Sequence, residues 1–308
     1  MKWMMSHKII TIVSMIAGIL LLIGGIGLAN VYSSVETTAE QMHEPLKIPV
    51  SAYREIPSPI KDKQPLSFLL LGVDEREDDT GRADTIIVVT VNPNENTTKM
   101  ISIPRDTYTE IIGLEMMDKI NHSYAFGGAK MATLTVENLL QIPIDYTISI
   151  NMEGFIDLVD AIEGVEVENN LAFEMDDHLY KLGNIHVNGE QALAFVRMRY
   201  GDPNGDFGRQ ERQKIVLDAI VNKLKSFNSV WKYKELLAVA GDQVRTNLTF
   251  DEMKTISTDY TYSFSNVESL SFQNGNGEKL KNVWYYMLDN EELEDAQLQL
   301  RTHLELND

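Results

Sequence analysis

Cysteine is absent from this chain of 308 residues. That absence excludes thiol nucleophiles, cysteine-based zinc sites and disulfide bonds. Positive charge is scarce as well: 27 lysines and arginines stand against 46 aspartates and glutamates, and the net charge is -19. Because such a field repels phosphate-rich polymers, we expect no nucleic-acid partner. The chain also lacks the G-x-S-x-G and H-E-x-x-H motifs of common hydrolases.

The longest apolar run lies near the start of the chain. Residues 9–29, IITIVSMIAGILLLIGGIGLA, carry no charge, and a helix of that length spans about 31 Å, enough to cross a bilayer. Lys2 and Lys8 precede the run and glutamates follow it, so the positive-inside rule leaves residues 1–8 in the cytoplasm. We therefore predict a transmembrane signal-anchor that places the rest of the chain outside the cell membrane, as in a single-pass type II protein. The alternative is a buried core helix.

Beyond the anchor, the chain divides into two predicted parts. Residues 30–63 begin polar and then become rich in proline, which favours extended chain, so we expect an extracellular stalk. Residues 64–308 are interpreted as one globular domain. Within it, GNGEK at 275–279 lacks the spacing of a P-loop and is interpreted as a turn.

Three apolar, β-branched segments with turn residues between them predict strands at 66–74, 84–92 and 98–106. Consecutive strands with short connections usually form an antiparallel meander. In a meander, Asp74, Asp84 and Arg105 would emerge at one edge of the sheet. Two carboxylates at that edge could hold a hard cation such as Mg²⁺, with substrate oxygens completing its shell. The alternative, which the spacing alone favours, is that Asp74 and Asp84 only flank a hairpin loop.

Helical and extended patterns then alternate. The periodicity predicts helices at 127–140 and 152–164 with a strand at 144–151 between them, and this alternation indicates an α/β layered domain. A further helix is predicted to start at Asn188, because Asn188 and Gln191 have the spacing of a capping box.

Five of the 27 basic residues lie within residues 197–214. The glycine-rich loop GDPNGDFG leads there into a helix expected from Gly208, with Arg209 and Gln213 on one face. A helix N-terminus attracts phosphate, and arginine forks bind phosphate oxygens in pairs. The segment therefore has the parts of a phosphate clamp.

Two interpretations of these arginines stay open. We favour the clamp, because Arg197 and Arg199 follow an apolar run rather than a polar surface. The alternative is a solvated helix face whose arginines pair with nearby acids such as Asp202, and this explains Arg212 well. Since the sequence shows no convincing nucleophile, a clamp would suit direct transfer of a phosphoryl group to an incoming hydroxyl.

Several segments of the chain resemble a known family. In order they are FLLLGVDER, GRADT, SIPRD, KINHSYAFGG, VNGEQALAFVRMR and DFGRQERQ. They look like successive motifs of the LytR–CpsA–Psr family, most closely of its Gram-positive teichoic acid transferase branch. The resemblance runs from Leu66 to beyond Leu224 and includes the membrane anchor. It implies a three-layer α/β/α domain with a central mixed β-sheet, preceded by one N-terminal transmembrane helix.

The resemblance also implies an activity. The family moves an anionic glycopolymer, here wall teichoic acid, from an undecaprenyl diphosphate carrier to peptidoglycan outside a Gram-positive-type cell membrane. The product would be a phosphodiester to the C6 hydroxyl of N-acetylmuramic acid, formed with the help of Mg²⁺ (or Mn²⁺). The alternatives are a non-catalytic protein that binds polyprenyl lipids, a membrane-bound regulator, and a plain polyprenyl diphosphatase.

Matching the motifs position by position implies two sets of residues. The catalytic set is Asp74, Asp84, Arg105 and Asp206, of which Asp74 and Asp84 would be metal ligands. The diphosphate-binding set is Arg82, Arg105, Arg197, Arg199, Arg209 and Gln213; Arg76 matches as well. The lipid tail would need an apolar tunnel, which the helices around 131–140 and 152–162 could line.

Overall fold

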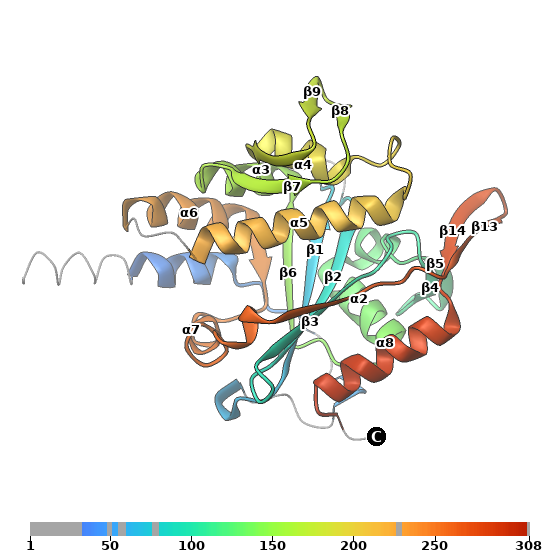
Figure 1. Ribbon diagram of the computed structural model, residues 1–308. Coiled ribbons are helices and arrows are strands. Elements are labelled where there is room, and N and C mark those ends of the chain that lie inside the picture. Colours follow the sequence, from blue (N-terminus) through green and yellow to red (C-terminus); the bar gives the residue numbers. More distant parts are fainter. Residues whose placement is uncertain (1–32, 48–50, 55–59, 76–79, 226–229, 307–308) are drawn as a thin grey trace, which may run out of the picture.

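The computed structural model describes residues 33–47, 51–54, 60–75, 80–225 and 230–306 (Figure 1). The predicted signal-anchor, residues 9–29, lies outside the described residues. Within the described part of the chain, no helix is both long enough and apolar enough to cross a membrane.

A six-stranded mixed sheet forms the centre of the domain, in the order β11-β6-β1-β2-β3-β12. Its strands are β1 (Leu66–Val73), β2 (Ala83–Asn92), β3 (Thr97–Ser102), β6 (Tyr146–Asn151), β11 (Val244–Thr246) and β12 (Val267–Leu270). The first three strands form an antiparallel meander, as predicted. β6 runs parallel to β1 and β12 runs parallel to β3, whereas β11 is antiparallel to β6. The predicted α/β class with a central mixed sheet is therefore confirmed.

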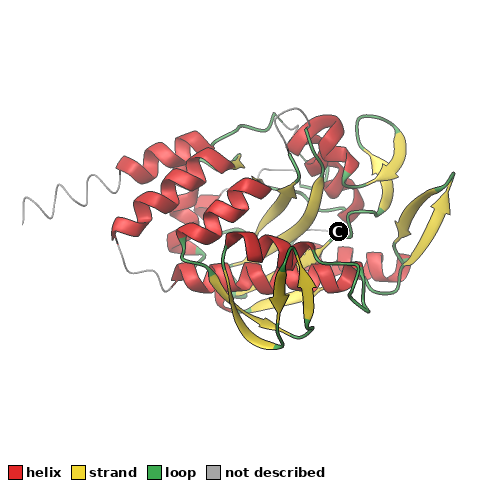
Figure 2. Cartoon of the chain, turned by 90° about the horizontal axis from the view of Figure 1, so that it is seen from above, coloured by secondary structure: helices red, strands yellow, loops and turns green. Residues whose placement is uncertain are grey.

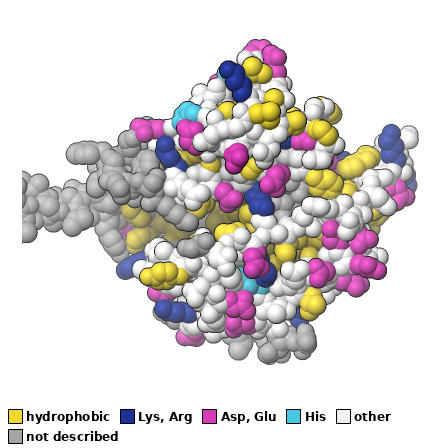
Figure 3. All heavy atoms as spheres, in the orientation of Figure 1, with side chains coloured by type: hydrophobic (Ala, Val, Ile, Leu, Met, Phe, Trp, Pro, Cys, Tyr) yellow, Lys and Arg dark blue, Asp and Glu magenta, His cyan; other side chains and the backbone are white. Residues whose placement is uncertain are grey.

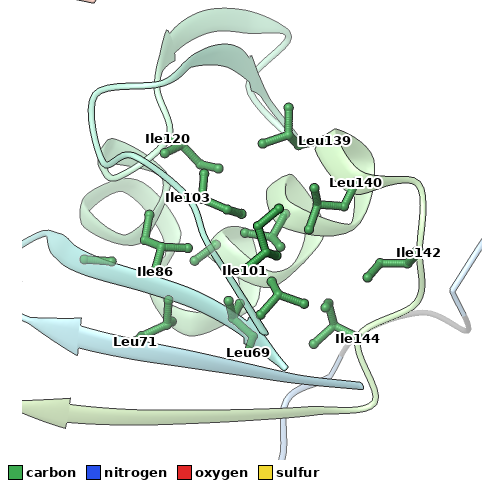
Figure 4. Packing of buried hydrophobic residues seen from close by; sticks show 14 of the residues in the cluster. Leu69, Leu71, Ile86, Ile101, Ile103, Ile120, Leu139, Leu140, Ile142 and Ile144 are labelled. Atoms are coloured by element: carbon green, nitrogen blue, oxygen red, sulfur yellow. The ribbon is translucent and has the colours of Figure 1, made fainter. Parts of the chain in front are cut away.

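One face of the sheet carries the main hydrophobic core. Leu69 and Leu71, alternate residues of β1, are buried in a cluster with residues of α2 (His122–Leu140) and α8 (Asn290–His303). Figure 4 shows Leu140 of α2 beside these strands in that cluster. Each such side chain contributes about 1.5–3 kcal/mol when it is fully buried. Because these residues fill one face of the sheet, the residues that alternate with them along each strand lie on the opposite face.

Helices also cover the opposite face of the sheet, and these are α3 (Met152–Ala161), α4 (Gly189–Arg197) and α5 (Asp206–Lys225). A second buried cluster joins them to β7 (Val165–Asn169), and α6 (Val230–Gln243) packs beside α3. Seen from above in Figure 2, the strands of the sheet lie between helices. The domain thus has three layers. As predicted, Asn188 and Gln191 form a capping box at the start of α4.

α2 begins earlier than the sequence predicts. Its first residue is His122, and Gly127 and Gly128 then interrupt the helix with non-helical dihedral angles, φ being 61° at Gly128. Glycine is a poor helix former, which is why the periodicity became visible only after this pair. The residues before the pair nevertheless fold as a helical turn.

The segment GNGEK is not the turn that the sequence predicts. Asn276–Leu280 form β13, which pairs with β14 (Val283–Met287), and the turn lies instead at Lys281 and Asn282, both with positive φ. The β13–β14 hairpin projects from the body of the domain near the start of α5 (Figure 1). Glycine in a strand often marks the close approach of another group, and Gly277 is such a case, as described below.

Part of the segment predicted to be a stalk contacts the domain. A helix at residues 33–42 leads to His43, which bridges to Thr246 of β11, and the Glu44 amide donates to the Thr246 carbonyl at 2.7 Å. Thr38 and Ala39 of this helix are buried. The boundary at residue 64 stays a prediction, but the described residues 33–47 lie against the sheet edge.

Short elements complete the described part of the domain. They are η1 (Ile60–Asp62), β4 (Tyr108–Ile111), β5 (Met116–Lys119), β8 (Phe173–Met175), β9 (His178–Tyr180), β10 (Gly183–Val187), α7 (Phe250–Asp259) and η2 (Ser263–Ser265).

Candidate active site

A cavity of about 660 Å³ lies between the sheet and the helices α3, α4 and α5. Its walls are mostly apolar and include Leu70 of β1, Ile150 of β6 and Phe155 of α3. These strand residues alternate with those of the main core, so the same pleat that fills one face leaves the other face to line the cavity. Figure 3 shows a hollow with hydrophobic side chains on its floor, left of centre on that face of the molecule.

The cavity follows the axis of α5. Arg209, Gln213, Leu217 and Ile220 all line it, and their spacing places them on one face of the helix. Their separation corresponds to about 16 Å along the helix axis. The cavity is thus a long channel with a polar end at Arg209 and an apolar end at Ile220.

The expected tunnel is lined by only one of the two helices named for it. Met152, Phe155 and Leu158 of α3 line the cavity, in agreement with the sequence. α2 does not, because its apolar residues, such as Val136, are buried in the core on the opposite face of the sheet. The remaining helical wall comes from α4 and α5. Helical periodicity shows which residues of a helix are buried but not which face of the sheet they cover.

Six of the residues singled out from the sequence meet at the polar end of this cavity. They are Asp84, Arg105, Arg197, Arg199, Arg209 and Gln213. They come from the start of β2, the segment after β3, the end of α4 and the first turns of α5, so only the folded domain brings them together. Four arginines at the end of one apolar channel form a site for an anionic head group on an apolar tail.

Asp84 and Arg105 are in direct contact. Arg105 Nη1 donates to Asp84 Oδ2 at 2.7 Å, and Asn121 Nδ2 donates to Asp84 Oδ1 at 3.3 Å. This contact confirms that the meander brings the start of the second strand and the end of the third to one edge. Arg105 therefore points into the cavity with its guanidinium held from one side.

Arg209 lines the cavity but is otherwise buried, with 5% of its surface exposed. Its Nη2 atom is 3.0 Å from Asp206 Oδ1, and Arg199 Nε is 3.8 Å from the same oxygen. Burial lowers the pKa of Arg209, and the nearby charge of Arg105 lowers it further, while Asp206 raises it. Two arginines near one another in a partly dry site attract an anion strongly.

Some of the N–H groups of these arginines remain available. Among the residues that the structure describes, the buried Nε atoms of Arg105 and Arg209 have no hydrogen-bond partner. A buried donor without a partner costs free energy, and an anion between the two guanidinium groups would satisfy both. The donors of the site thus fit a ligand rich in phosphate oxygens.

Three other residues of the predicted sets do not line the cavity. Asp74 follows β1, where its amide donates to the Arg82 carbonyl at 3.0 Å. Arg82 is exposed. Asp206 stands behind Arg199 and Arg209 as their counter-ion. Arg76 lies outside the described residues.

Arg212 belongs to the framework of the site. Its Nε atom donates to the Phe195 carbonyl at 3.0 Å, and its Nη1 atom donates to Asp202 at 2.6 Å. The pairing with acids that the sequence offered as an alternative therefore holds for Arg212. Its guanidinium ties α5 to the end of α4 and to the loop between them.

Two contributors to the site were missed from the sequence. Asn121 holds Asp84, and Lys119 Nζ lies 2.7 Å from Asp106, next to Arg105. Both residues come from the segment KINHSYAFGG, so the motif itself was the available signal. Their contacts depend on the turn after Arg105, which no local pattern reveals.

Few side chains of the described residues could act as ligands of a metal ion. Among the described residues, no group of three or more histidines, aspartates and glutamates could hold a metal. At the polar end of the cavity, Asp84 contributes a carboxylate to the lining beside Arg105. Mg²⁺ is commonly bound by one or two carboxylates together with substrate phosphates and water. At this end Asp84 would be the residue that holds such an ion together with phosphate oxygens, and its two oxygens also accept from Arg105 and Asn121.

Comparison with known proteins shows to which family the chain belongs. The model of the LytR_cpsA_psr family matches residues 29–302. The chain belongs to this family. The resemblance found in the motifs is thus confirmed over residues 29–302.

Named members of the family are similar over their full length. The chain is 46% identical to the polyisoprenyl-teichoic acid–peptidoglycan teichoic acid transferase TagU of Bacillus anthracis, over 98% of this chain and 99% of the relative. It is 44% identical to the crystal structure of B. subtilis TagU, with a TM-score of 0.63, over 80% of this chain and 98% of that one. The family protein YwtF (TagT), solved with bound octaprenyl pyrophosphate lipid, is 29% identical with a TM-score of 0.67, over 85% of this chain and 100% of that one.

Proposed function

We propose that this protein transfers an anionic glycopolymer, wall teichoic acid in the first place, from an undecaprenyl diphosphate carrier to peptidoglycan. One observation carries the proposal: a single channel joins an apolar wall to a cluster of four arginines. A polyprenyl diphosphate has the same two parts in the same order. The names of the relatives, teichoic acid transferases and a lipid-bound family member, support this assignment.

The reaction is a phosphoryl transfer in this proposal. The apolar channel holds the prenyl chain, and Arg105, Arg199 and Arg209 neutralise the diphosphate. The C6 hydroxyl oxygen of N-acetylmuramic acid attacks the phosphorus that carries the sugar. A new P–O bond forms, the bond to the bridging oxygen breaks, and undecaprenyl phosphate leaves. The hydroxyl proton passes to water at the polar end, where Asp84, which lines the channel beside Arg105, holds that arginine in place.

The arginines contribute mainly electrostatic stabilisation. Charge on the leaving phosphate grows as the bridging bond breaks, and preorganised guanidinium donors stabilise that charge without reorganisation. Mg²⁺ (or Mn²⁺), held by Asp84 with Asp74 near the same sheet edge, would polarise phosphate oxygens in the same sense. Asp206 acts as a positioning residue, since its carboxylate orients Arg199 and Arg209.

We further propose that residues 9–29 anchor the protein in the cell membrane, with the domain outside. In that location the lipid carrier lies in the same bilayer and peptidoglycan is adjacent.

The test uses the full chain in detergent micelles with Mg²⁺. It is incubated with a synthetic undecaprenyl diphosphate-linked disaccharide and uncross-linked glycan strands, and the products are identified by mass spectrometry. We expect a phosphodiester-linked disaccharide on the strands, lost in Arg105→Ala and Asp84→Ala but retained in the control Lys181→Ala, which removes an exposed charge.

Two other outcomes would contradict the proposal. Release of undecaprenyl phosphate without a linked product would identify a diphosphatase, in which water is the nucleophile. Lipid binding without turnover, equal in all variants, would leave a binding protein.

A further inference from the structure

A second pocket, of about 290 Å³, adjoins the arginine cluster. It lies between the start of α5 and the β13–β14 hairpin, and we call it the hairpin pocket. Its lining includes Phe207, Asn204, Gln210, Gly277, Trp284 and Tyr286. Aromatic rings with a few amide groups form a surface suited to sugars, because a sugar ring packs its C–H groups on an aromatic face and bonds through its hydroxyls.

The glycines of β13 make room for these rings. A Cβ atom on Gly277 would lie 2.6 Å from Trp284 Nε1, and one on Gly275 would lie 2.5 Å from the Tyr286 hydroxyl. Both contacts are too close for a real side chain. The rings of β14 therefore lie across the facing strand, and the two glycines are needed to keep them there.

The hairpin is attached to the segment that follows Arg105. The Tyr286 amide donates to the Asp106 carbonyl at 2.9 Å, and Thr107 forms a bridge with the same tyrosine. The Phe207 and Tyr286 rings are in edge contact, with centroids 5.7 Å apart. The pocket is thus held in place by the residues that immediately follow Arg105 and by the first turn of α5.

The hairpin pocket and the channel lie on different sides of the arginine cluster. Arg209 lines the channel and Phe207 lines the pocket, and two residues correspond to about 200° around a helix, so they face nearly opposite ways. Similarly, Asp106 lines the pocket while Arg105 lines the channel. Arg199 lines both.

The two acids in the pocket wall are already paired with cations. Asp106 is paired with Lys119 at 2.7 Å, and Asp206 is paired with Arg209 at 3.0 Å. The groups left to recognise a ligand are mainly aromatic faces, the side-chain amide of Asn204 and the oxygen of the Gln210 amide, whose nitrogen donates to Asp206 Oδ2 at 3.2 Å. Such a wall suits the C–H faces, hydroxyls and acetamido groups of a sugar, and Arg199 at its border is shared with the channel.

We propose that the hairpin pocket binds the acceptor, an N-acetylated sugar unit of the peptidoglycan glycan strand, with Trp284 as its stacking platform. This inference rests on the proposed transfer reaction. In an in-line displacement the nucleophile enters opposite the leaving group. The leaving undecaprenyl phosphate occupies the channel, so the acceptor hydroxyl must approach from the other side of the arginines, where this pocket lies.

Binding is tested first, without any donor or turnover. The full chain in micelles is titrated calorimetrically with a tetrasaccharide of alternating N-acetylglucosamine and N-acetylmuramic acid. We expect Trp284→Ala to weaken binding about tenfold or more, and Trp284→Phe to weaken it only about threefold because an aromatic face remains. The control Tyr262→Ala removes an aromatic ring that is 80% exposed elsewhere on the surface, and it should bind like the native chain.

A donor measurement on the same variants controls for folding. The affinity of Trp284→Ala for the undecaprenyl diphosphate-linked disaccharide should stay within about twofold of the native value, because the channel is intact. Failure of the native chain to bind the tetrasaccharide, or equal binding by Trp284→Ala, would overturn the proposal. A tenfold loss of donor affinity with unchanged tetrasaccharide binding would assign the pocket to the donor sugars and would also overturn it.

The transfer assay separates this inference from the proposed function. In Trp284→Ala we expect the KM for glycan strands to rise about tenfold while the KM for the donor is unchanged. Transfer with an unchanged acceptor KM would leave the transferase standing and refute the acceptor site. Aromatic-dependent binding of the tetrasaccharide without transfer by any variant would refute the transferase and leave the sugar site.

Discussion

Asp202 and Arg212 form an ion pair of 2.6 Å in which the two side chains are only 4% and 6% exposed. Arg212 is on α5, and Asp202 is in the loop that carries the chain from Arg199 to Asp206. Since Arg212 also donates to the Phe195 carbonyl, the pair fixes this loop relative to α4 and α5. The position of Arg199 at the polar end of the channel therefore depends on a contact outside it.

Removal of Asp202 should destabilise the domain. In Asp202→Ala the Arg212 charge stays buried without its counter-ion, and we expect a loss of about 3 kcal/mol in the free energy of unfolding. Urea denaturation of the full chain in micelles measures this loss. The matched control Glu294→Ala removes an exposed acid of α8 and should change the value by less than about 0.5 kcal/mol. Equal stability of the two variants would show that the pair contributes nothing.

Gly208 is tied to the same pair. A Cβ atom at this position would lie 1.8 Å from Asp202 Oδ2. Gly→Ala in a helix normally stabilises by about 1 kcal/mol, but here the displacement of Asp202 should outweigh that gain, so Gly208→Ala should lower stability. In an Asp202→Ala background the sign should reverse and the alanine should stabilise. A double-mutant cycle by urea denaturation checks the reversal, and the same sign in both backgrounds would contradict it.

The contact between Asp84 and Arg105 should matter for catalysis more than for stability. Both side chains are about a quarter exposed, so we expect Asp84→Asn to change stability by less than about 1 kcal/mol. Under the proposed function, its kcat/KM for transfer should fall about 10²- to 10³-fold, because a charge that orients Arg105 and would hold Mg²⁺ is lost. Steady-state transfer kinetics and thermal unfolding of the same preparation provide the comparison. A loss of activity matched by a loss of folded protein would argue against this role.

The parts of the site that could be predicted from the sequence are those formed by neighbouring elements. β1, β2 and β3 follow one another with short turns, so their meander and the position of Asp84 and Arg105 at one edge of the sheet were predictable from local patterns, whereas the contact between the two side chains was not. The capping box of Asn188 was likewise local. Arg197, Arg199 and Arg209 could be expected to lie close together, because only a loop and the start of a helix separate them along the chain.

The parts that could not be predicted depend on distant segments. Tyr286 meets Phe207, and Trp284 lines the same pocket, only through the tertiary fold, and the glycines beside them were interpreted as a turn. The side of the sheet that α2 covers was also not predictable, because its apolar face fits either side. The family motifs end before Trp284 and Tyr286, and they did not give the arrangement of the channel and the hairpin pocket.

His303 should make stability depend on pH. It is 1% exposed, and its Nδ1 and Nε2 atoms lie 2.7 and 2.9 Å from the hydroxyls of Thr90 and Thr97. Burial lowers its pKa below 6.5, with Glu95, Lys99 and Glu268 acting as weaker influences. The unfolded chain therefore binds a proton below about pH 6.5 that the folded chain does not, and stability is lost as pH falls from there through the folded pKa.

The measurement is the free energy of unfolding between pH 8 and pH 5. The native chain should lose more stability over this interval than His303→Gln, although the variant should be the less stable protein at pH 8 because its hydroxyl contacts are disturbed. Comparing the two slopes cancels the contribution of the carboxylates, which both chains share. Parallel curves would show that His303 does not titrate differently in the two states.

The channel along α5 should make the affinity for a prenyl diphosphate depend on the length of its prenyl chain. Leu217 lines it two helical turns beyond Arg209, away from the arginines. A tryptophan at this position should obstruct the apolar end and leave the polar end open. We expect Leu217→Trp to weaken binding of undecaprenyl diphosphate about tenfold and binding of geranyl diphosphate less than about twofold, because only the longer chain reaches that depth. Leu298→Trp, at an exposed position of α8, is the matched control. Equal losses for both lipids would mean that the substitution disturbs the arginine cluster, and no loss for either would mean that the prenyl chain lies elsewhere.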